Sequence, residues 1–161
     1  MDRSYDGFSK LLHWSVAVLV VVQFATGWTW GYFERGTDPR FYLFRAHLIS
    51  GYAILALAVV RVLWRSVHGF RALPDGMSPP TALLARATHV VLYAAILVQP
   101  IIGIVVTTAF GKSLGRLPNT VHITLAYVIF GLVALHVLGA LWHHFGRRDG
   151  LLYRMLPVRR S

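Results

Sequence analysis

The hydrophobic positions of the chain gather into four long segments that are almost free of Asp, Glu, Lys and Arg. The segments are Leu11–Phe33, Ala46–Trp64, Ala87–Gly111 and Leu117–Gly146, and the only such charged residue in them is Arg61. A helix needs about 20 mainly apolar residues to cross a bilayer core, and backbone polar groups in lipid must bond within their own segment. The alternation typical of a membrane β-barrel is absent. The pattern predicts an all-α membrane protein, a bundle of four transmembrane helices.

We expect one domain, 1–161, whose helices have the approximate bounds 8–32, 43–65, 82–109 and 119–146. The first segment is long for a signal peptide and no small-residue cleavage site follows it, so it should be retained. Residues 70–81 are rich in Pro and Gly and predict a loop. Residues 147–161 predict either an amphipathic segment on the membrane surface or a solvated basic tail. No internal repeat is evident.

Composition and charge refine this picture. The chain has 161 residues, is 56% hydrophobic, contains no cysteine and carries a net charge of +10. The lack of cysteine excludes a disulfide framework, thiolate metal ligation and thioether-linked haem. Four crossings place both termini on the same side of the membrane, and 11 of the 16 Lys and Arg residues fall on that side. After the acidic residues are subtracted, that side has a net charge of +7 and the other side +3. This bias predicts cytoplasmic termini and argues against a nucleic-acid partner.

Seven of the eight histidines lie in or at the ends of the predicted helices: His13, His47, His89, His122, His136, His143 and His144. Ionisable side chains at membrane depth are costly and mark functional sites. His122 and His136 share one helix face, roughly 21 Å apart along the axis. His47 lies level with His122, and His13 lies near the inner end of the first helix. The spacing therefore predicts two pairs, His13 with His136 and His47 with His122.

Two pairs of imidazoles at two depths suit haem. Zinc would need further ligands that neither level offers, whereas a porphyrin leaves only two axial positions on its iron for the protein. The sequence therefore predicts a bundle enclosing two b-type haems, used for electron transfer because the iron has no open position. Small residues one turn beyond each histidine either leave room for the macrocycle or simply allow close helix packing. These residues are Ala17, Gly51, Ala126 and Ala140.

Two arginines follow the second-helix histidine on the same face. Arg61 lies 14 residues after His47, at the depth of the His13–His136 pair. Because an arginine fork suits a carboxylate, we expect Arg61 to bind the haem propionates there. Arg65, one turn further, either joins it or extends toward the lipid head groups.

Three further histidines have open roles. His89 lies near the inner end of the third predicted helix and is an alternative to His13 as the partner of His136. His143 and His144 are adjacent, so their side chains point about 100° apart. They mark either a quinone or proton site near the inner face or the membrane interface.

Short motifs along the whole chain follow one family pattern. They are Leu12-His13-Trp14, Ala46-His47 with Arg61 and Trp64-Arg65, Gln99-Pro100-Ile101-Ile102-Gly103, His122 with His136, and Met155-Leu156-Pro157. With these motifs the chain resembles the bacterial cytochrome b561 proteins. The resemblance implies that His13 and His136 bind one haem, that His47 and His122 bind the other, and that His89 is not a ligand.

The resemblance also implies a function in the bacterial inner membrane. Members of the family exchange electrons with ubiquinone, and one group oxidises superoxide while reducing the quinone. We therefore expect an oxidoreductase of the superoxide:ubiquinone type, in which outer cations attract the anion: Arg35, Arg40, Arg45, Lys112 and Arg116. The outer segment Phe110–Asn119 is shorter than in superoxide-oxidising relatives.

Two other functions stay open. The short outer segment favours an anchor subunit with a flat surface, which links quinone to a periplasmic redox partner. A haem-free transporter or structural bundle, whose histidines relay protons or bind metal, is the alternative of another class. Small-residue helix faces permit an oligomer.

Overall fold

The computed structural model describes residues 4–69 and 77–156. Four long helices dominate it: α1 (Gly7–Thr29), α2 (Asp38–His68), α3 (Pro79–Thr107) and α5 (Leu117–Leu141). Each is long and apolar enough to cross a membrane. In the described parts of the chain every regular element is helical, so the predicted all-α fold with four membrane helices is confirmed.

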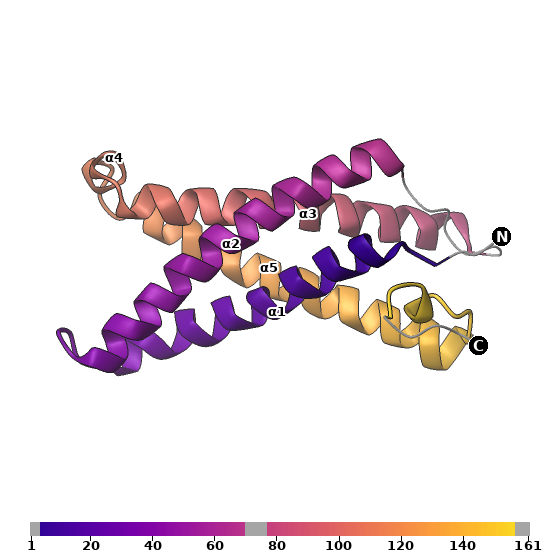
Figure 1. Cartoon of the computed structure of the whole chain (residues 1–161), viewed down its shortest axis with the longest axis horizontal. Helices are drawn as coiled ribbons and strands as arrows, with labels where there is room; N and C mark the ends of the chain where they lie inside the picture. The colour runs from indigo at the N-terminus through magenta and orange to yellow at the C-terminus, as the bar shows by residue number, and fades with distance from the viewer. Residues whose placement is uncertain (1–3, 70–76, 157–161) are drawn as a thin grey trace.

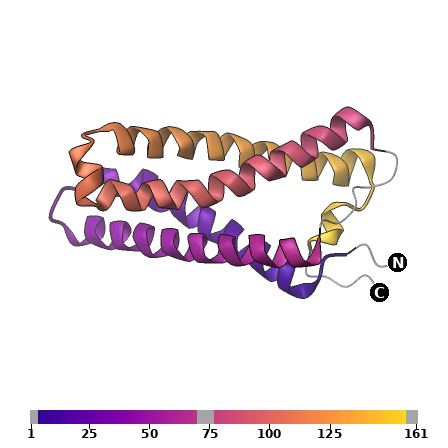
Figure 2. The same ribbon diagram turned by 90° about the horizontal axis from the view of Figure 1, so that it is seen from above.

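Short elements join and end these helices. They are η1 (Trp30–Tyr32), α4 (Ala109–Ser113), the π-helical turn η2 (Trp142–Arg147) and η3 (Leu152–Arg154). The long helices run alternately between two ends of the bundle (Figures 1 and 2). One end carries η1 and α4, and we call it the α4 end. The other carries the start of α1 and the segment after α5, and we call it the terminal end.

Local signals explain where the helices begin. The Asp6 carboxylate caps α1 by accepting hydrogen bonds from the Ser9 backbone N–H at 2.8 Å and from the Ser9 hydroxyl at 2.6 Å. Burial would raise the pKa of Asp6, but the bonds from Ser9 outweigh it and hold that pKa below its usual value. α2 and α3 each have proline in their first turn, where its missing N–H costs nothing. α2 therefore begins at Asp38, ahead of the hydrophobic run.

The helices pack as two antiparallel pairs. α1 lies against α2 and α3 against α5, while α2 also contacts α3. The buried apolar core of the described residues is thin: Leu12, Val16, Ile54, Ala58, Leu92, Ala95 and Ile129. Large apolar side chains such as Leu11 and Val21 are 62% and 67% exposed. So much exposed apolar surface suits a lipid environment, not water.

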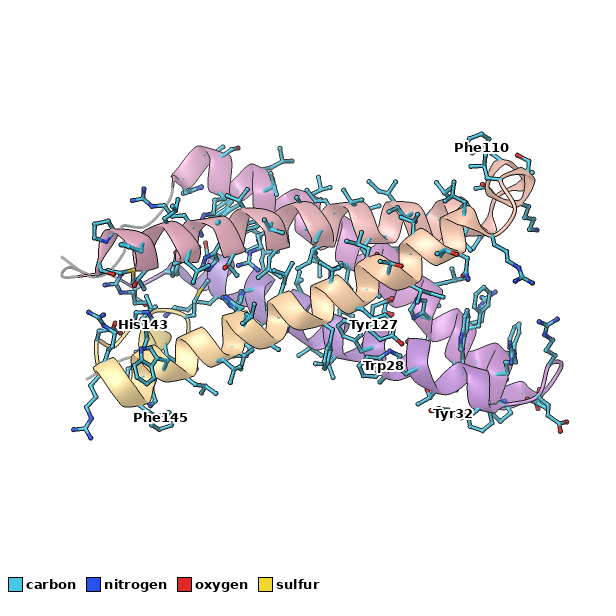
Figure 3. All side chains as sticks on the ribbon, turned by 180° about the vertical axis from the view of Figure 1, so that it is seen from behind. Trp28, Tyr32, Phe110, Tyr127, His143 and Phe145 are labelled. Atoms are coloured by element: carbon cyan, nitrogen blue, oxygen red, sulfur yellow. The ribbon has the colours of Figure 1, made fainter. Side chains whose placement is uncertain are left out.

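Aromatic side chains lie at both ends of the bundle. Tyr32 and Phe110 project from the α4 end and Phe145 from the terminal end (Figure 3). All three are well exposed. Aromatic belts in membrane proteins favour the level of the lipid head groups, so we expect the two ends of the bundle to lie at the two faces of the bilayer.

The segment after α5 folds back onto the start of α1. The backbone N–H of Tyr5 donates to the carbonyl of Arg154 at 3.1 Å, and Trp14 Nε1 donates to the carbonyl of Met155 at 2.9 Å. We call residues 149–156 the C-terminal strap. The rest of the expected tail, 157–161, and residues 70–76 of the expected loop lie outside the described residues.

Candidate functional site

The structure brings His47 of α2 and His122 of α5 together near the α4 end. Their ring centres are 6.2 Å apart and their planes cross at 79°. A metal–imidazole bond is about 2.0–2.1 Å long and the ring nitrogen lies about 1.2 Å from the ring centre, so two imidazoles on opposite sides of one metal have centres about 6.4 Å apart. The separation of His47 and His122 is that of a bis-imidazole site.

A cavity of about 330 Å³ lies around these two rings. Two glycines of its lining lie directly against the imidazole rings. A Cβ at Gly103 of α3 would lie 2.9 Å from His122 Cε1, and a Cβ at Gly27 of α1 would lie 3.3 Å from His47 Cε1. Gly51, predicted to leave room at this level, also lines the cavity. Each imidazole therefore packs against the backbone of a glycine, and a side chain at that glycine would push the ring out of its position.

Glutamines hold the backbone of both histidines. Gln23 Nε2 donates to the carbonyl of His47 at 2.6 Å and to Ser50 Oγ at 2.7 Å. Gln99 Nε2 donates to the carbonyl of His122 at 3.0 Å. Sequence reasoning missed this role of the glutamines, although each stands four residues before a glycine that contacts the same histidine ring.

The second pair forms toward the terminal end, between α1 and α5. The ring centres of His13 and His136 are also 6.2 Å apart, with planes at 68°. His89 of α3 lies closer to His136, at 5.1 Å, and its Nδ1 is 2.6 Å from the carbonyl of Ala85. Of the two candidate partners, His13 therefore has the separation of a bis-imidazole site, and His89 is too close.

Arg61 and Arg65 take different positions near the His13–His136 pair. Arg61 is half-buried, and its charge acts on both rings of that pair. Its Nε donates to the hydroxyl of Tyr93 at 3.1 Å. Arg65 instead extends toward the N-terminus, where Nη2 donates to the hydroxyl of Tyr5 at 3.4 Å. Arg61 is therefore the arginine whose described interactions include the histidine pair.

Comparison with known proteins identifies the group to which this arrangement belongs. The family model for prokaryotic cytochrome b561 matches residues 4–158. The chain belongs to the prokaryotic cytochrome b561 family. Family membership makes it a membrane cytochrome b that transfers electrons and implies b-type haem.

Three relatives of this cytochrome b561 chain cover almost its whole length. A Yersinia pestis protein named "Probable superoxide oxidase CybB" is 29% identical over 182 residues, with 100% of both chains covered. "Cytochrome b561 homolog 2" of Escherichia coli is 31% identical, with 94% of this chain and 90% of the relative covered. "Cytochrome b562" of Cereibacter sphaeroides is 29% identical, with 98% of both covered.

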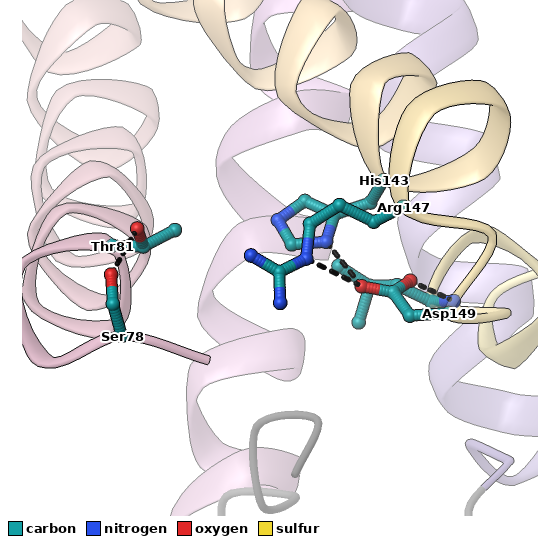
Figure 4. A network of polar contacts seen from close by, with 6 residues as sticks. Ser78, Thr81, His143, Arg147 and Asp149 are labelled. Atoms are coloured by element: carbon teal, nitrogen blue, oxygen red, sulfur yellow. Dashed lines mark hydrogen bonds and ion pairs between the residues drawn. The ribbon is translucent and has the colours of Figure 1, made fainter. Parts of the chain in front are cut away.

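The adjacent histidines of this cytochrome b561 protein diverge, as their spacing predicts. His143 is buried, and its Nδ1 is hydrogen-bonded to the Asp149 carboxylate, which also accepts from the Leu151 backbone N–H at 3.0 Å (Figure 4). The ring of His144 instead packs edge-on against Tyr153. His143 therefore links η2 to the first residue of the C-terminal strap, Asp149.

The Asp149 carboxylate has a perturbed pKa outside the membrane. Burial would raise its pKa, but the hydrogen bonds from His143 and from the Leu151 N–H outweigh this, and the pKa lies below its usual value. Arg147 Nε lies 4.0 Å away and adds to the effect. The carboxylate is thus charged at neutral pH and holds the strap.

Proposed function

We propose that this protein binds two b-type haems and carries electrons between the two faces of the membrane. The supporting observation is that both histidine pairs have ring centres 6.2 Å apart. The residues fit the group in two further respects: Gly27 and Gly103 seat the rings of one pair, and the buried Nδ1 atoms of His13 and His122 have no protein partner. Each of those rings therefore has a buried nitrogen to which the described protein groups offer no hydrogen bond.

The two sites span most of the bilayer. His122 and His136 lie roughly 21 Å apart along α5 at a rise of 1.5 Å per residue. Between them Ile54 and Ile129 are buried and exclude water. Haem held by two imidazoles supplies one-electron transfer and has no open position for O₂. The chain's part is to fix the four imidazoles at two depths and to keep the interval dry.

Arg61 is the residue that we assign to the propionates of the His13–His136 haem. Its charge acts on both histidines, and one nitrogen is used by Tyr93, which leaves the two terminal nitrogens of the fork for a carboxylate. Arg65 is directed to Tyr5 and has a secondary part at this site. We further place the terminal end in the cytoplasm of a bacterial cell, from the excess of Lys and Arg on that side.

We propose superoxide as the electron donor and ubiquinone as the acceptor. The relative named as a probable superoxide oxidase supports this. At the α4 end an open cavity of about 510 Å³ is lined by Arg40 and Asp38 and shares Trp30 and Phe44 with the cavity at His47. The Trp30 ring lies 5.7 Å from that of His47. A small anion attracted there would reach the edge of the site without touching the iron.

The test begins with the haem content of the purified protein. A pyridine haemochrome assay should give two haems b per chain, and reduction should produce b-type bands. One or no haem would contradict the two-site proposal, and a haem-free protein would favour the transporter or structural bundle.

The superoxide and ubiquinone assignments are tested together, in an assay that is separate from the haem measurement. With superoxide generated in the assay, the loaded protein should reduce a ubiquinone analogue faster than the spontaneous rate, and salt should slow the reaction because cations attract the donor. Superoxide dismutase should abolish it. No acceleration would remove the superoxide assignment while leaving the haem assignment intact.

A second function is favoured by the surface around α4. Phe110 and Leu114 are 67% and 43% exposed beside Lys112 and Arg116. An apolar patch rimmed by cations suits a soluble acidic redox protein, as expected of an anchor subunit. Co-purification of such a protein, lost on the change Phe110→Glu, would support this function over superoxide oxidation.

A further inference from the structure

The two helix pairs carry one signature in the same order. Paired positions on α1 and α3 are His13/His89, Gln23/Gln99 and Gly27/Gly103, and paired positions on α2 and α5 are His47/His122, Tyr52/Tyr127 and Ile54/Ile129. The two members of each α1/α3 pair are 76 positions apart in the sequence, and the two members of each α2/α5 pair are 75 positions apart. The expectation of no internal repeat is therefore corrected. The repeat escapes inspection of the sequence because the lipid-facing positions between these residues are interchangeable apolar side chains.

Contacts repeat along with residues. Gln23 donates to the carbonyl of His47 as Gln99 does to that of His122. Gly27 contacts the ring of His47 as Gly103 contacts the ring of His122. His47 and His122 therefore occupy equivalent positions in two copies of one helical hairpin, α1–α2 and α3–α5, so the surroundings of the two histidines can be compared position by position.

One such difference lies beside the paired glycines. Thr26, before Gly27, is only 7% exposed, and its hydroxyl donates to the carbonyl of Val22 at 2.7 Å. Its oxygen is 3.0 Å from His47 Nδ1. Because the hydroxyl proton is given to Val22, the oxygen accepts from Nδ1–H, which leaves the lone pair of His47 on Nε2.

The other copy lacks this hydrogen bond. The position equivalent to Thr26 is Ile102, before Gly103, and isoleucine offers no acceptor. The buried Nδ1 of His122 accordingly has no hydrogen-bond partner. His122 is therefore oriented by packing alone, while His47 is oriented by packing and by a hydroxyl.

We propose that Thr26 is a positioning residue that makes the two ligands of this pair unequal. It fixes the tautomer and the ring angle of His47 and raises the donor strength of Nε2. A stronger donor stabilises ferric iron, so Thr26 lowers the reduction potential of the haem at this pair and helps to retain it. The proposal rests on the proposed function, since it requires haem at His47 and His122.

The test compares two opposite changes by redox titration of the purified haem-loaded protein. Thr26→Val keeps the side-chain shape and removes the hydroxyl, so it should raise the potential of one haem, leave the other unchanged, and weaken haem retention about 10–100-fold. Ile102→Thr supplies the missing acceptor to His122 and should lower the potential of the same haem. Thr26→Ser keeps the hydroxyl and should behave as the unmodified chain does.

Outcomes separate this proposal from the one on which it rests. If the unmodified chain binds two haems but Thr26→Val leaves both potentials unchanged, or shifts both equally, the role of Thr26 is wrong while the haem sites stand. If the unmodified chain binds no haem, both proposals fail. Should Thr26→Val not fold, Ile102→Thr decides alone, because it leaves α1 intact: an unchanged or raised potential would overturn the proposal.

Discussion

His13 and His136 come from opposite ends of the sequence, yet their ring centres stand 6.2 Å apart between α1 and α5. His89 of α3 approaches His136 to 5.1 Å, which is too close for two imidazoles on opposite sides of one metal. The geometry thus favours His13 over His89 as the partner of His136.

This preference predicts unequal effects of two similar substitutions. His13→Ala should reduce the haem content from two to one per chain, because His136 loses its partner. His89→Ala should keep two. Haem content is measured per chain after purification, with His144→Ala in η2 as a matched control, because His144 packs against Tyr153 and away from both histidine pairs. Loss of a haem in His89→Ala, or its retention in His13→Ala, would reassign the ligand.

The glycine contacts predict a graded series at the other pair. Gly103→Ala places a Cβ 2.9 Å from His122 Cε1, so the ring must shift, and haem retention at this site should fall at least tenfold, as for other losses of ligand support. Gly27→Ala, at 3.3 Å from His47, should have a smaller effect. Gly131→Ala meets nothing within 4 Å and should leave haem retention unchanged. Equal effects of all three changes would mean that the ring contacts are irrelevant.

Arg61 predicts a shift in one reduction potential. Arg61→Leu removes a positive charge near the His13–His136 pair. Because the loss of that charge stabilises ferric over ferrous iron, the reduction potential of that haem should fall by roughly 60 mV, which is a tenfold change in the equilibrium constant of a one-electron couple. Arg61→Lys should recover part of the shift. Tyr93→Phe is the matched control, since it removes the hydrogen bond to Arg61 and keeps the charge. An unchanged potential in Arg61→Leu would rule out the propionate assignment.

The bond between His143 and Asp149 predicts a pH-dependent stability. The pKa of Asp149 is lowered in the folded protein. The contribution of its carboxylate to folding stability is therefore complete above the ordinary pKa of 3.8 and is lost as the pH falls through the lowered pKa. Asp149→Asn should cost about 1 kcal/mol at pH 7, and the difference from the unmodified chain should vanish in acid. Thermal unfolding in detergent at both pH values measures this, with exposed Glu34→Gln as the control. A difference that persists in acid would contradict the role of the charge.

Much of the architecture follows from the sequence by itself. Lipid offers no hydrogen bonds to the backbone, so each long apolar run must be a helix, and four runs with their charge bias determine a four-helix membrane protein. Helical periodicity likewise determines that His122 and His136 share one face of α5 at two depths. These properties depend only on positions along one helix, which is why they can be derived without knowing how helices meet.

Which side chains meet was decided by tertiary structure. His13 and His89 lie at similar depth, and only the lateral packing of α1 and α3 around α5 gives one of them the 6.2 Å separation from His136. The contact of Gly103 with His122 and the hydrogen bond of Thr26 to His47 likewise depend on the distance between neighbouring helices. Hydropathy and periodicity determine the depth of a residue in the membrane and the helix face on which it lies. They carry no information on which helices are neighbours, because every arrangement of the four helices that is compatible with lipid satisfies them equally.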